Sequence, residues 1–168
     1  EIRCQDYRDV NERFDRVVSI GMFEHVGCRN YPRYVKTVAD TLEPGGLFLL
    51  HTIGVTGTRH GVDPWVIKYI FPHAMLPTMG EIADSFAKSF VMKDWHNLGE
   101  DYIRTLFAWH RNFNEHWPEF ADRYGERFKR MWNYFLLYFA GGFSAEHIQV
   151  WQILWSQKGR PAQPAHFR

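Results

Sequence analysis

The sequence predicts an α/β domain that begins with a strand, a helix and a second strand. The first strand, Phe14–Ile20, is rich in apolar residues and ends at Gly21. The second, Leu47–Leu50, is apolar without alternation, which is typical of a strand covered on both faces. Two such strands joined by a helix are parallel, with a right-handed crossover. The 168 residues are enough for one domain with a core.

The helix of this βαβ unit is expected from about Pro32 to Leu42. Val35, Val38 and Leu42 recur at helical spacing and form its apolar stripe. The segment Glu43–Gly46 (EPGG) has the composition of a turn and is expected to end the helix before the second strand.

The rest of the chain is expected to be mainly helical, with two further strands. In chain order we expect short helices at Asp63–Ile70 and Glu81–Ser89, a strand at Phe90–Trp95, a mostly helical segment at Asp101–Trp117, a long helix from Trp117 to Ala140 and a last strand at Ile148–Trp155. Gly141 and Gly142 are expected to end the long helix.

One face of the long helix carries a row of large, mostly aromatic side chains. They recur at spacings of three and four, at Phe120, Tyr124, Phe128, Met131, Phe135 and Phe139. Such a stripe more often packs into a core than lines a ligand cavity. The whole chain is 17% aromatic, and both interpretations stay open: a core packed with rings, or a cavity walled by rings for an apolar or cationic ligand.

The composition argues against several functional classes. Lys and Arg number 20 against 19 Asp and Glu, so the basic excess that is usual in nucleic-acid-binding domains is absent. Cys4 and Cys28 make no disulfide framework and fit a reducing cytosol. No apolar run approaches the roughly 18 residues that a spanning helix needs. We therefore expect a cytoplasmic protein that binds no nucleic acid.

Titratable residues follow both predicted strands of the βαβ unit. Glu24 and His25 come just after the first strand, and His51 follows the second. Ligands of parallel sheets bind outside the carboxyl ends of the strands, and neighbouring strands lie about 4.8 Å apart. Taken alone, Glu24 fits a surface carboxylate at a helix start, and His51 fits a satisfied histidine at a strand end. Their common edge of the sheet favours one shared site.

A metal site is a competing use of the same kind of side chain. The possible ligands are Glu24, His25, His51, His60, His73 and His96. No H-x-x-x-H or C-x-x-C spacing organises them, and the chain has no G-x-S-x-G elbow or P-loop. We therefore predict no metal and treat a metal hydrolase as the weaker hypothesis.

Six segments follow one another in a characteristic order: QDYRD (5–9), FDRVVSIGMFEHVG (14–27), LLHTIG (49–54), VDPWVIKYIFP (62–72), DWHNLGEDY (94–102) and ERFKRMW (126–132). Together they closely resemble the C-terminal part of cyclopropane-fatty-acyl-phospholipid synthases, to which mycolic acid cyclopropane synthases are more distantly related. Each segment alone is a weak signal, but FEHVG, HTIG and DPW are specific as a set. The resemblance implies a Rossmann-like, class I S-adenosylmethionine-dependent methyltransferase with a helical insertion over the substrate site.

The resemblance also implies a reaction and a set of catalytic residues. The substrate would be the cis double bond of an unsaturated acyl chain in a membrane phospholipid. The alkene attacks the sulfonium methyl, a carbocation forms, and a base removes a proton so that the ring closes. The implied base is a bound bicarbonate, and the family's ligands for it fall at Glu24, His51, the backbone of Ile53, and Tyr102.

Contacts with S-adenosylmethionine are implied at five positions. Asp6 and Tyr7 match the loop that borders the adenine, and the backbone of Ile20 and Gly21 matches the segment beside the methionine half. His25 is expected to face the cofactor rather than the anion.

The resemblance implies that part of the catalytic domain is absent from residues 1–168. The family's Gly-rich loop for the methionine carboxylate, its acidic residue for the ribose and a cysteine of the anion site would lie upstream of Glu1. We therefore expect one partial methyltransferase domain over residues 1–168, without the N-terminal strands and the Gly-rich loop. Its first strand would present a bare apolar edge.

The implied enzyme is cytoplasmic and contacts the inner membrane surface as a peripheral protein, and the assembly we would expect is a homodimer. Two alternatives stay open. One is a fatty-acyl methyltransferase that closes no ring. The other is an inactive, lipid-binding fragment.

Overall fold

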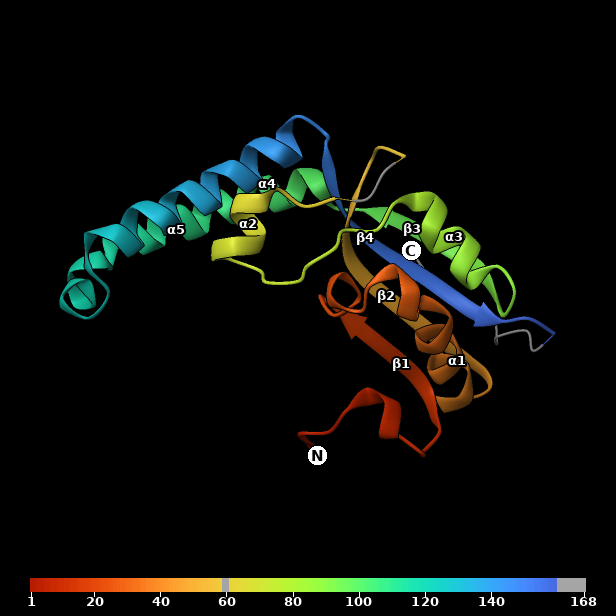
Figure 1. Cartoon of the computed structure of the whole chain (residues 1–168). Helices are drawn as coiled ribbons and strands as arrows, with labels where there is room; N and C mark the ends of the chain where they lie inside the picture. The colour runs from red at the N-terminus through yellow and green to blue at the C-terminus, as the bar shows by residue number, and fades with distance from the viewer. Residues whose placement is uncertain (59–60, 160–168) are drawn as a thin grey trace.

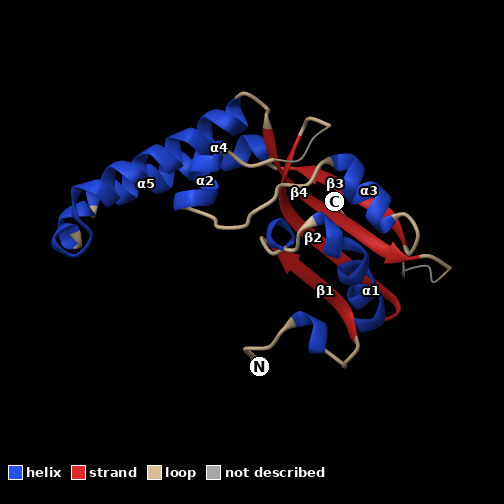
Figure 2. Cartoon of the chain, viewed as in Figure 1, coloured by secondary structure: helices blue, strands red, loops and turns tan. Residues whose placement is uncertain are grey.

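The computed structural model describes residues 1–58 and 61–159, which form a mixed sheet flanked by helices (Figures 1 and 2). The sheet order is β1-β2-β4-β3. The strands are β1 (Phe14–Ile20), β2 (Leu42–Val55), β3 (Phe90–Asn97) and β4 (Ile148–Gln157). The helices are α1 (Tyr31–Thr41), α2 (Pro64–Tyr69), α3 (Met79–Phe86), α4 (Gly99–Glu115) and α5 (Ala121–Ser144).

The predicted βαβ unit is confirmed. β1 has the predicted bounds and pairs in parallel with β2. α1 begins and ends one residue earlier than predicted. β3 and β4 start at the predicted residues and run two residues further, and each pairs antiparallel with its neighbours in the sheet. α3 begins two residues early because Thr78 and Glu81 form a capping box at its start.

The predicted limits of β2 are wrong at both ends. The segment Glu43–Gly46, expected as a turn outside the strand, lies inside β2 as a bulge, where the ladder with β1 skips from Leu42 to Leu47. Gly45 has a φ of 82°, a left-handed conformation that glycine adopts without a steric penalty. β2 also continues to Val55, because β4 pairs with it that far.

The long helix also departs from its prediction. A 3-10 turn at Trp117–Glu119 precedes α5, and Gly125 interrupts α5 with a φ of 72° and a ψ of 167°. The helix then runs through Gly141 and Gly142 to Ser144. Each glycine costs a helix about 1 kcal/mol relative to alanine. Burial of the Phe143 ring, which is 2% exposed, compensates for that cost.

The core has two parts on opposite faces of the sheet. On one face lie α1 and α3 (Figure 1). The core there is rich in rings, which include Phe23, Tyr34, Phe48, Phe86 and Trp155. On the other, α2, α4 and α5 meet β4 through Val66, Leu106, Phe135, Phe139 and Val150. Side chains of β2 alternate between the two, with Leu50 in the first cluster and Ile53 against the second.

α4 and α5 pack side by side and project beyond the sheet, with α2 against them (Figure 2). The aromatic row of α5 serves two purposes along this arm. Phe135 and Phe139 are buried core residues, as the stripe favoured. Tyr124, Phe128 and Met131 line a surface groove instead. Within the described residues, every helix is too short or too polar to cross a membrane.

The expected apolar edge on β1 is present. Among the described residues, β1 pairs with β2 alone. Val18 and Ile20 are 55% and 68% exposed, and Phe14 is 42% exposed. An exposed apolar strand of this kind is a ready surface for further pairing or packing.

Candidate active site

Glu24 is a buried carboxylate fixed at the junction of β1 and β2. It lies in the 3-10 turn Phe23–His25 that follows β1, and it is 6% exposed. Its Oε1 accepts a hydrogen bond from the backbone N–H of Ile53 at 2.7 Å. Its own carbonyl accepts one from the N–H of Met75, also at 2.7 Å. Backbone groups from two directions therefore hold this residue in one position.

The second carboxylate oxygen of Glu24 is different. Oε2 is buried, and within the described part of the chain it has no hydrogen-bond partner. A buried carboxylate oxygen without a donor is costly, so such an atom calls for a ligand or a water molecule. The arrangement suits a ligand that carries a hydrogen-bond donor.

His51 lies inside β2, opposite the last residue of β1, Ile20. The prediction that His51 follows the end of its strand is wrong. Its predicted position beside the end of β1 is right, since the N–H of Gly21 donates to the His51 carbonyl at 3.0 Å. The ring Nδ1 lies 3.2 Å from Nε2 of Gln152, its partner across the β2–β4 ladder. With the amide in this orientation, the Gln152 NH₂ donates, so Nδ1 accepts and the ring proton is on Nε2.

Tyr102 brings a hydroxyl from α4. Its ring packs against Phe143 and Trp109, with centroid distances of 5.3 and 5.9 Å. Burial raises the pKa of the Tyr102 phenol above its usual value, and the negative charge of Glu24 adds to the effect. The hydroxyl therefore stays protonated at neutral pH and is available as a donor. Tyr102 also packs against the same core cluster as Ile53, the residue bonded to Glu24, although α4 is distant in sequence.

Three of the four residues predicted to hold an anion lie at the junction of β1 and β2, and the fourth packs beside it from α4. Glu24 and Ile53 are in direct contact, His51 is level with the end of β1, and Tyr102 packs against the same core cluster as Ile53. One detail differs from the expectation. The N–H of Ile53, expected to face the anion, donates to Glu24 instead.

The residues predicted to meet the cofactor lie on the more open side of β1. Tyr7 and His25 line a cavity of about 280 Å³. Tyr7 and Ile20 line a second one of about 310 Å³. Gly21 has a φ of 61°, and a Cβ built on it would meet nothing within 4 Å. The backbone at Gly21 is therefore open to close approach by another group.

Like Gly21, Asp6 lines neither cavity. Its Oδ1 accepts from the backbone N–H and the Nε of Arg8, both at 2.9 Å. The hydrogen bonds from Arg8 hold the pKa of Asp6 well below its usual range. Asp6 thus caps the turn that carries Tyr7 instead of facing a cavity.

The competing metal hypothesis finds no support in the geometry. In residues 1–58 and 61–159, no three His, Cys, Asp or Glu side chains are grouped so that they could hold a metal ion. His60 lies outside the described residues.

Gln152 was missed in the sequence. With Gln149, it is one of two glutamines in the otherwise apolar predicted strand Ile148–Trp155, and an amide in such a strand could have been taken as a sign of a buried partner. The backbone contact from Met75 had no sequence signal, because a main-chain donor depends only on where the loop runs.

The sheet, the helical arm and the site at the ends of β1 and β2 define a class I S-adenosylmethionine-dependent methyltransferase fold. A crystal structure of mycolic acid cyclopropane synthase CmaA1 complexed with SAH and CTAB matches it with a TM-score of 0.81. That match covers 90% of this chain and 58% of the other, at 25% identity. The predicted fold class is confirmed.

The family follows from the sequence comparisons. The family model for mycolic acid cyclopropane synthetase matches residues 1–153, so the chain belongs to that family. Cyclopropane-fatty-acyl-phospholipid synthase of Escherichia coli strain K12 is 55% identical over 156 residues, which are 93% of this chain and 41% of that protein. Tuberculostearic acid methyltransferase UfaA1 of Mycobacterium tuberculosis is 34% identical over 169 residues, covering 96% of this chain and 39% of that protein. The chain therefore spans about two fifths of these curated relatives, and the predicted resemblance is confirmed.

Proposed function

We propose that this chain carries the anion-binding part of an enzyme that uses S-adenosylmethionine to build a cyclopropane ring on the cis double bond of a phospholipid acyl chain. The observation that carries the proposal is the Glu24 carboxylate, with Oε1 held by Ile53 and Oε2 buried without a partner among the described residues. Family membership and the 55% identity to a cyclopropane-fatty-acyl-phospholipid synthase supply the substrate class.

The donors and acceptors around Glu24 suit a bicarbonate ion. The protonated hydroxyl of Tyr102 and the Nε2–H of His51 are donors for the oxygens of an anion. Oε2 of Glu24 is an acceptor for the hydroxyl hydrogen of the same ion. A bicarbonate held there supplies a base, and S-adenosylmethionine supplies the methyl group. Glu24, His51 and Tyr102 are then the residues that hold the base and fix which of its oxygens is free.

Ile53 acts through Glu24 in this proposal. Its N–H takes one lone pair of the carboxylate and leaves the other oxygen to the ligand. A carboxylate beside an anion repels it unless it accepts a hydrogen from it, and that hydrogen bond raises the basicity of the ion. Glu24 thereby orients the base and favours its uptake of a proton.

Aromatic rings lie along this side of the site. Tyr102 packs on Phe143, and His25 lies 6.2 Å from the ring of Phe71, which in turn meets Phe139 at 6.3 Å. Water would trap a carbocation, whereas aromatic faces stabilise positive charge. The aromatic arm and the anion site therefore serve the same reaction.

The open side of β1 is proposed to receive the cofactor. Tyr7, Ile20 and His25 line the two adjoining cavities there, Gly21 follows Ile20 at the end of β1, and Asp6 fixes the turn that carries Tyr7. The unobstructed backbone at Gly21 suits close approach of the methionine half. The substrate is a phospholipid with an unsaturated acyl chain, reached by peripheral contact with the cytoplasmic face of the inner membrane.

Titration of the 168-residue chain with ¹³C-labelled bicarbonate, followed by NMR, tests the anion site directly. We expect saturable binding, weakened at least tenfold by Glu24→Gln, whose amide offers a hydrogen where the ion needs an acceptor. Glu100→Gln, an exposed carboxylate on α4, is the matched control and should bind as the unmodified chain does. Absence of saturable binding, or equal binding by the Glu24→Gln chain, would show that the anion site is misassigned.

A second candidate function is methyl transfer to an acyl double bond without ring closure, favoured by the 34% identity to a tuberculostearic acid methyltransferase. Both reactions add one carbon, so product mass does not discriminate methylene addition from cyclopropanation. NMR of the lipid product does, because cyclopropane ring protons appear only in the first proposal. Calorimetry with S-adenosylmethionine addresses the inactive-fragment alternative, which predicts no heat of binding.

A further inference from the structure

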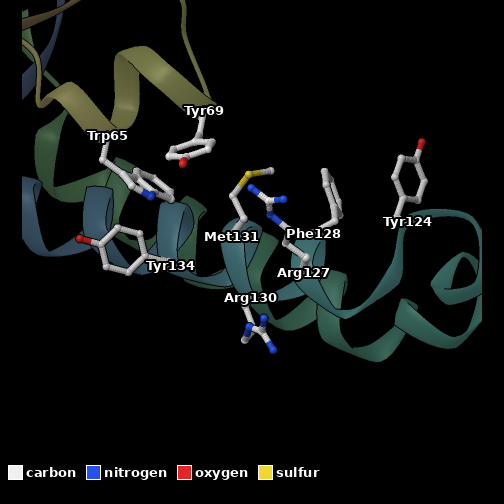
Figure 3. Close-up of a pocket in the computed structure, with 8 residues that line it drawn as sticks. All are labelled: Trp65, Tyr69, Tyr124, Arg127, Phe128, Arg130, Met131 and Tyr134. Atoms are coloured by element: carbon white, nitrogen blue, oxygen red, sulfur yellow. The ribbon is translucent and has the colours of Figure 1, made fainter.

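We propose that a groove between α2 and the first half of α5 binds the phosphate headgroup of a membrane phospholipid, with Arg127 as its anchor. The inference rests on the proposed function in one respect: it says where the lipid that carries the substrate meets the protein. The groove has a volume of about 620 Å³. Its apolar walls are formed by Trp65, Tyr69, Tyr124, Phe128, Met131 and Tyr134 (Figure 3).

The walls of this α2–α5 groove are ring pairs that leave polar edges in solvent. Trp65 and Tyr134 meet edge to face at 4.5 Å on one side, and Tyr124 and Phe128 lie 4.8 Å apart on the other. Tyr124 is 46% exposed and Tyr134 51% exposed. Tryptophan and tyrosine rings exposed in this way suit a boundary between water and an apolar phase.

Gly125 shapes one end of the groove. Its φ of 72° and ψ of 167° break α5 and turn the chain between Tyr124 and Arg127. Figure 3 shows Tyr124 at the opposite end of the groove from Trp65 and Tyr69. This conformation is accessible to glycine and strained for other residues. Gly125 therefore allows the chain to leave the helical path, so that Tyr124 forms the end wall of the groove.

The charged residues that line the groove are two cations, Arg127 and Arg130. The guanidinium of Arg127 lies beside Met131 and Phe128, whereas that of Arg130 points away from Met131 (Figure 3). Two further cations lie on rings of the groove wall. Lys68 is 5.1 Å from the centre of the Tyr69 ring, and Arg123 is 5.4 Å from that of Tyr124. Across the described residues, no carboxylate forms an ion pair with Lys68, Arg123 or Arg127. A guanidinium offers phosphate two parallel hydrogen bonds.

A phospholipid fits this combination better than a simpler ligand. An apolar partner would bury the Arg127 charge without compensation, and inorganic phosphate would leave the ring walls in water. Four further large apolar side chains on or next to α2 and α5 are exposed: Ile67, Phe71, Leu137 and Tyr138. Exposed apolar side chains near a cationic groove suit a lipid surface, with the headgroup in the groove and the acyl region against the rings.

Sedimentation with vesicles tests the proposal on the 168-residue chain. We expect binding to vesicles that contain phosphatidylglycerol, and Arg127→Gln should weaken it at least fivefold, the effect of removing one cation at a charged membrane. Arg104→Gln removes the same charge from an exposed position on α4, outside the groove, and is the matched control. We expect it to change the affinity by less than twofold. Equal losses in both variants would mean diffuse electrostatic attraction, and no loss in either would mean that the lipid binds elsewhere; both results overturn the proposal.

Fluorescence quenching locates the contact. Lipids brominated near the headgroup should quench the emission of Trp65, and Trp65→Phe should remove that part of the quenching. Inorganic phosphate at matched ionic strength should not displace the vesicles; displacement would show that the groove holds free phosphate instead. Circular dichroism of each variant excludes loss of folding. Vesicle binding requires neither the cofactor nor turnover, so its failure would leave the anion site at Glu24 untouched, and failure of bicarbonate binding would leave the groove standing.

Discussion

The two sides of the proposed site are built differently. On the anion side, Glu24 is 6% exposed and fixed by main-chain hydrogen bonds from Ile53 and Met75. On the cofactor side, Ile20 is 68% exposed, and a Cβ on Gly21 would meet nothing within 4 Å. A small ion makes few contacts, and the groups that hold it must be fixed because the position of a catalytic base must be accurate. A large cofactor needs surface, and most of what this chain offers for it is open. From this difference we expect mutations on the anion side to lower kcat. Mutations on the cofactor side should lower the affinity for S-adenosylmethionine, and by smaller factors.

The largest expected effect is that of Glu24→Gln in the active enzyme. The amide can still accept from Ile53, but it presents an NH₂ group where an acceptor is needed for the ion. We expect kcat to fall about 100-fold or more, the lower range for removal of general-base assistance, with the affinity for S-adenosylmethionine unchanged within about twofold.

Steady-state kinetics and cofactor titration check both halves of that prediction. Glu100→Gln again provides the control. Unchanged turnover would remove Glu24 from the mechanism, and an equal loss of cofactor affinity would erase the contrast between the two sides.

Tyr102→Phe should have the next largest effect, a fall in kcat of about tenfold through loss of one hydrogen bond to the ion. Because burial and Glu24 raise the pKa of the Tyr102 phenol, the hydroxyl is a donor throughout the neutral range and ionises only above its ordinary value of about 10. The pH–rate profile should therefore lack a limb from Tyr102 below pH 10. Thr105→Val on α4, which removes a hydroxyl that donates to the Asp101 carbonyl, is the control; a similar loss there would point to a general effect on α4.

Gln152 tests the anion side through the position of His51, because its amide contacts the His51 ring. Gln152→Leu should lower kcat about fivefold, equivalent to about 1 kcal/mol, because His51 is then free to take its other tautomer. Gln152→Glu offers an acceptor instead and should move the ring proton to Nδ1. Long-range ¹H–¹⁵N NMR of the histidine rings reports the tautomer independently of activity. If the His51 pattern is the same in all three chains, Gln152 has no part in positioning it.

The sequence predicted elements well where the signal is local. β1 ended where Gly21 follows an apolar run, and Glu24 was correctly placed at the edge shared with His51. The errors came where tertiary packing decides. Pairing with β4 extended β2 past His51, and burial of Phe143 carried α5 through two glycines. The partner of the Ile53 N–H and the role of Gln152 depend on residues brought together by the fold, so no spacing in the chain reveals them.

The smallest effect is expected at Asp6, which lies on the cofactor side. Its carboxylate is exposed and paired with Arg8, and exposed ion pairs contribute little because solvent screens them. We expect Asp6→Ala to weaken binding of S-adenosylmethionine by less than about threefold, through a looser turn at Tyr7, and to leave kcat unchanged. Because Arg8 lowers the pKa of Asp6, the capping contribution is complete above the ordinary carboxyl value of about 4 and is lost only as pH falls below it. Cofactor affinity should therefore show no dependence on Asp6 between pH 5 and pH 8. Calorimetry with Asp9→Ala as the control measures this. A loss of tenfold or more confined to Asp6→Ala would mean that Asp6 contacts the cofactor itself, and that the cofactor side is as closely specified as the anion side.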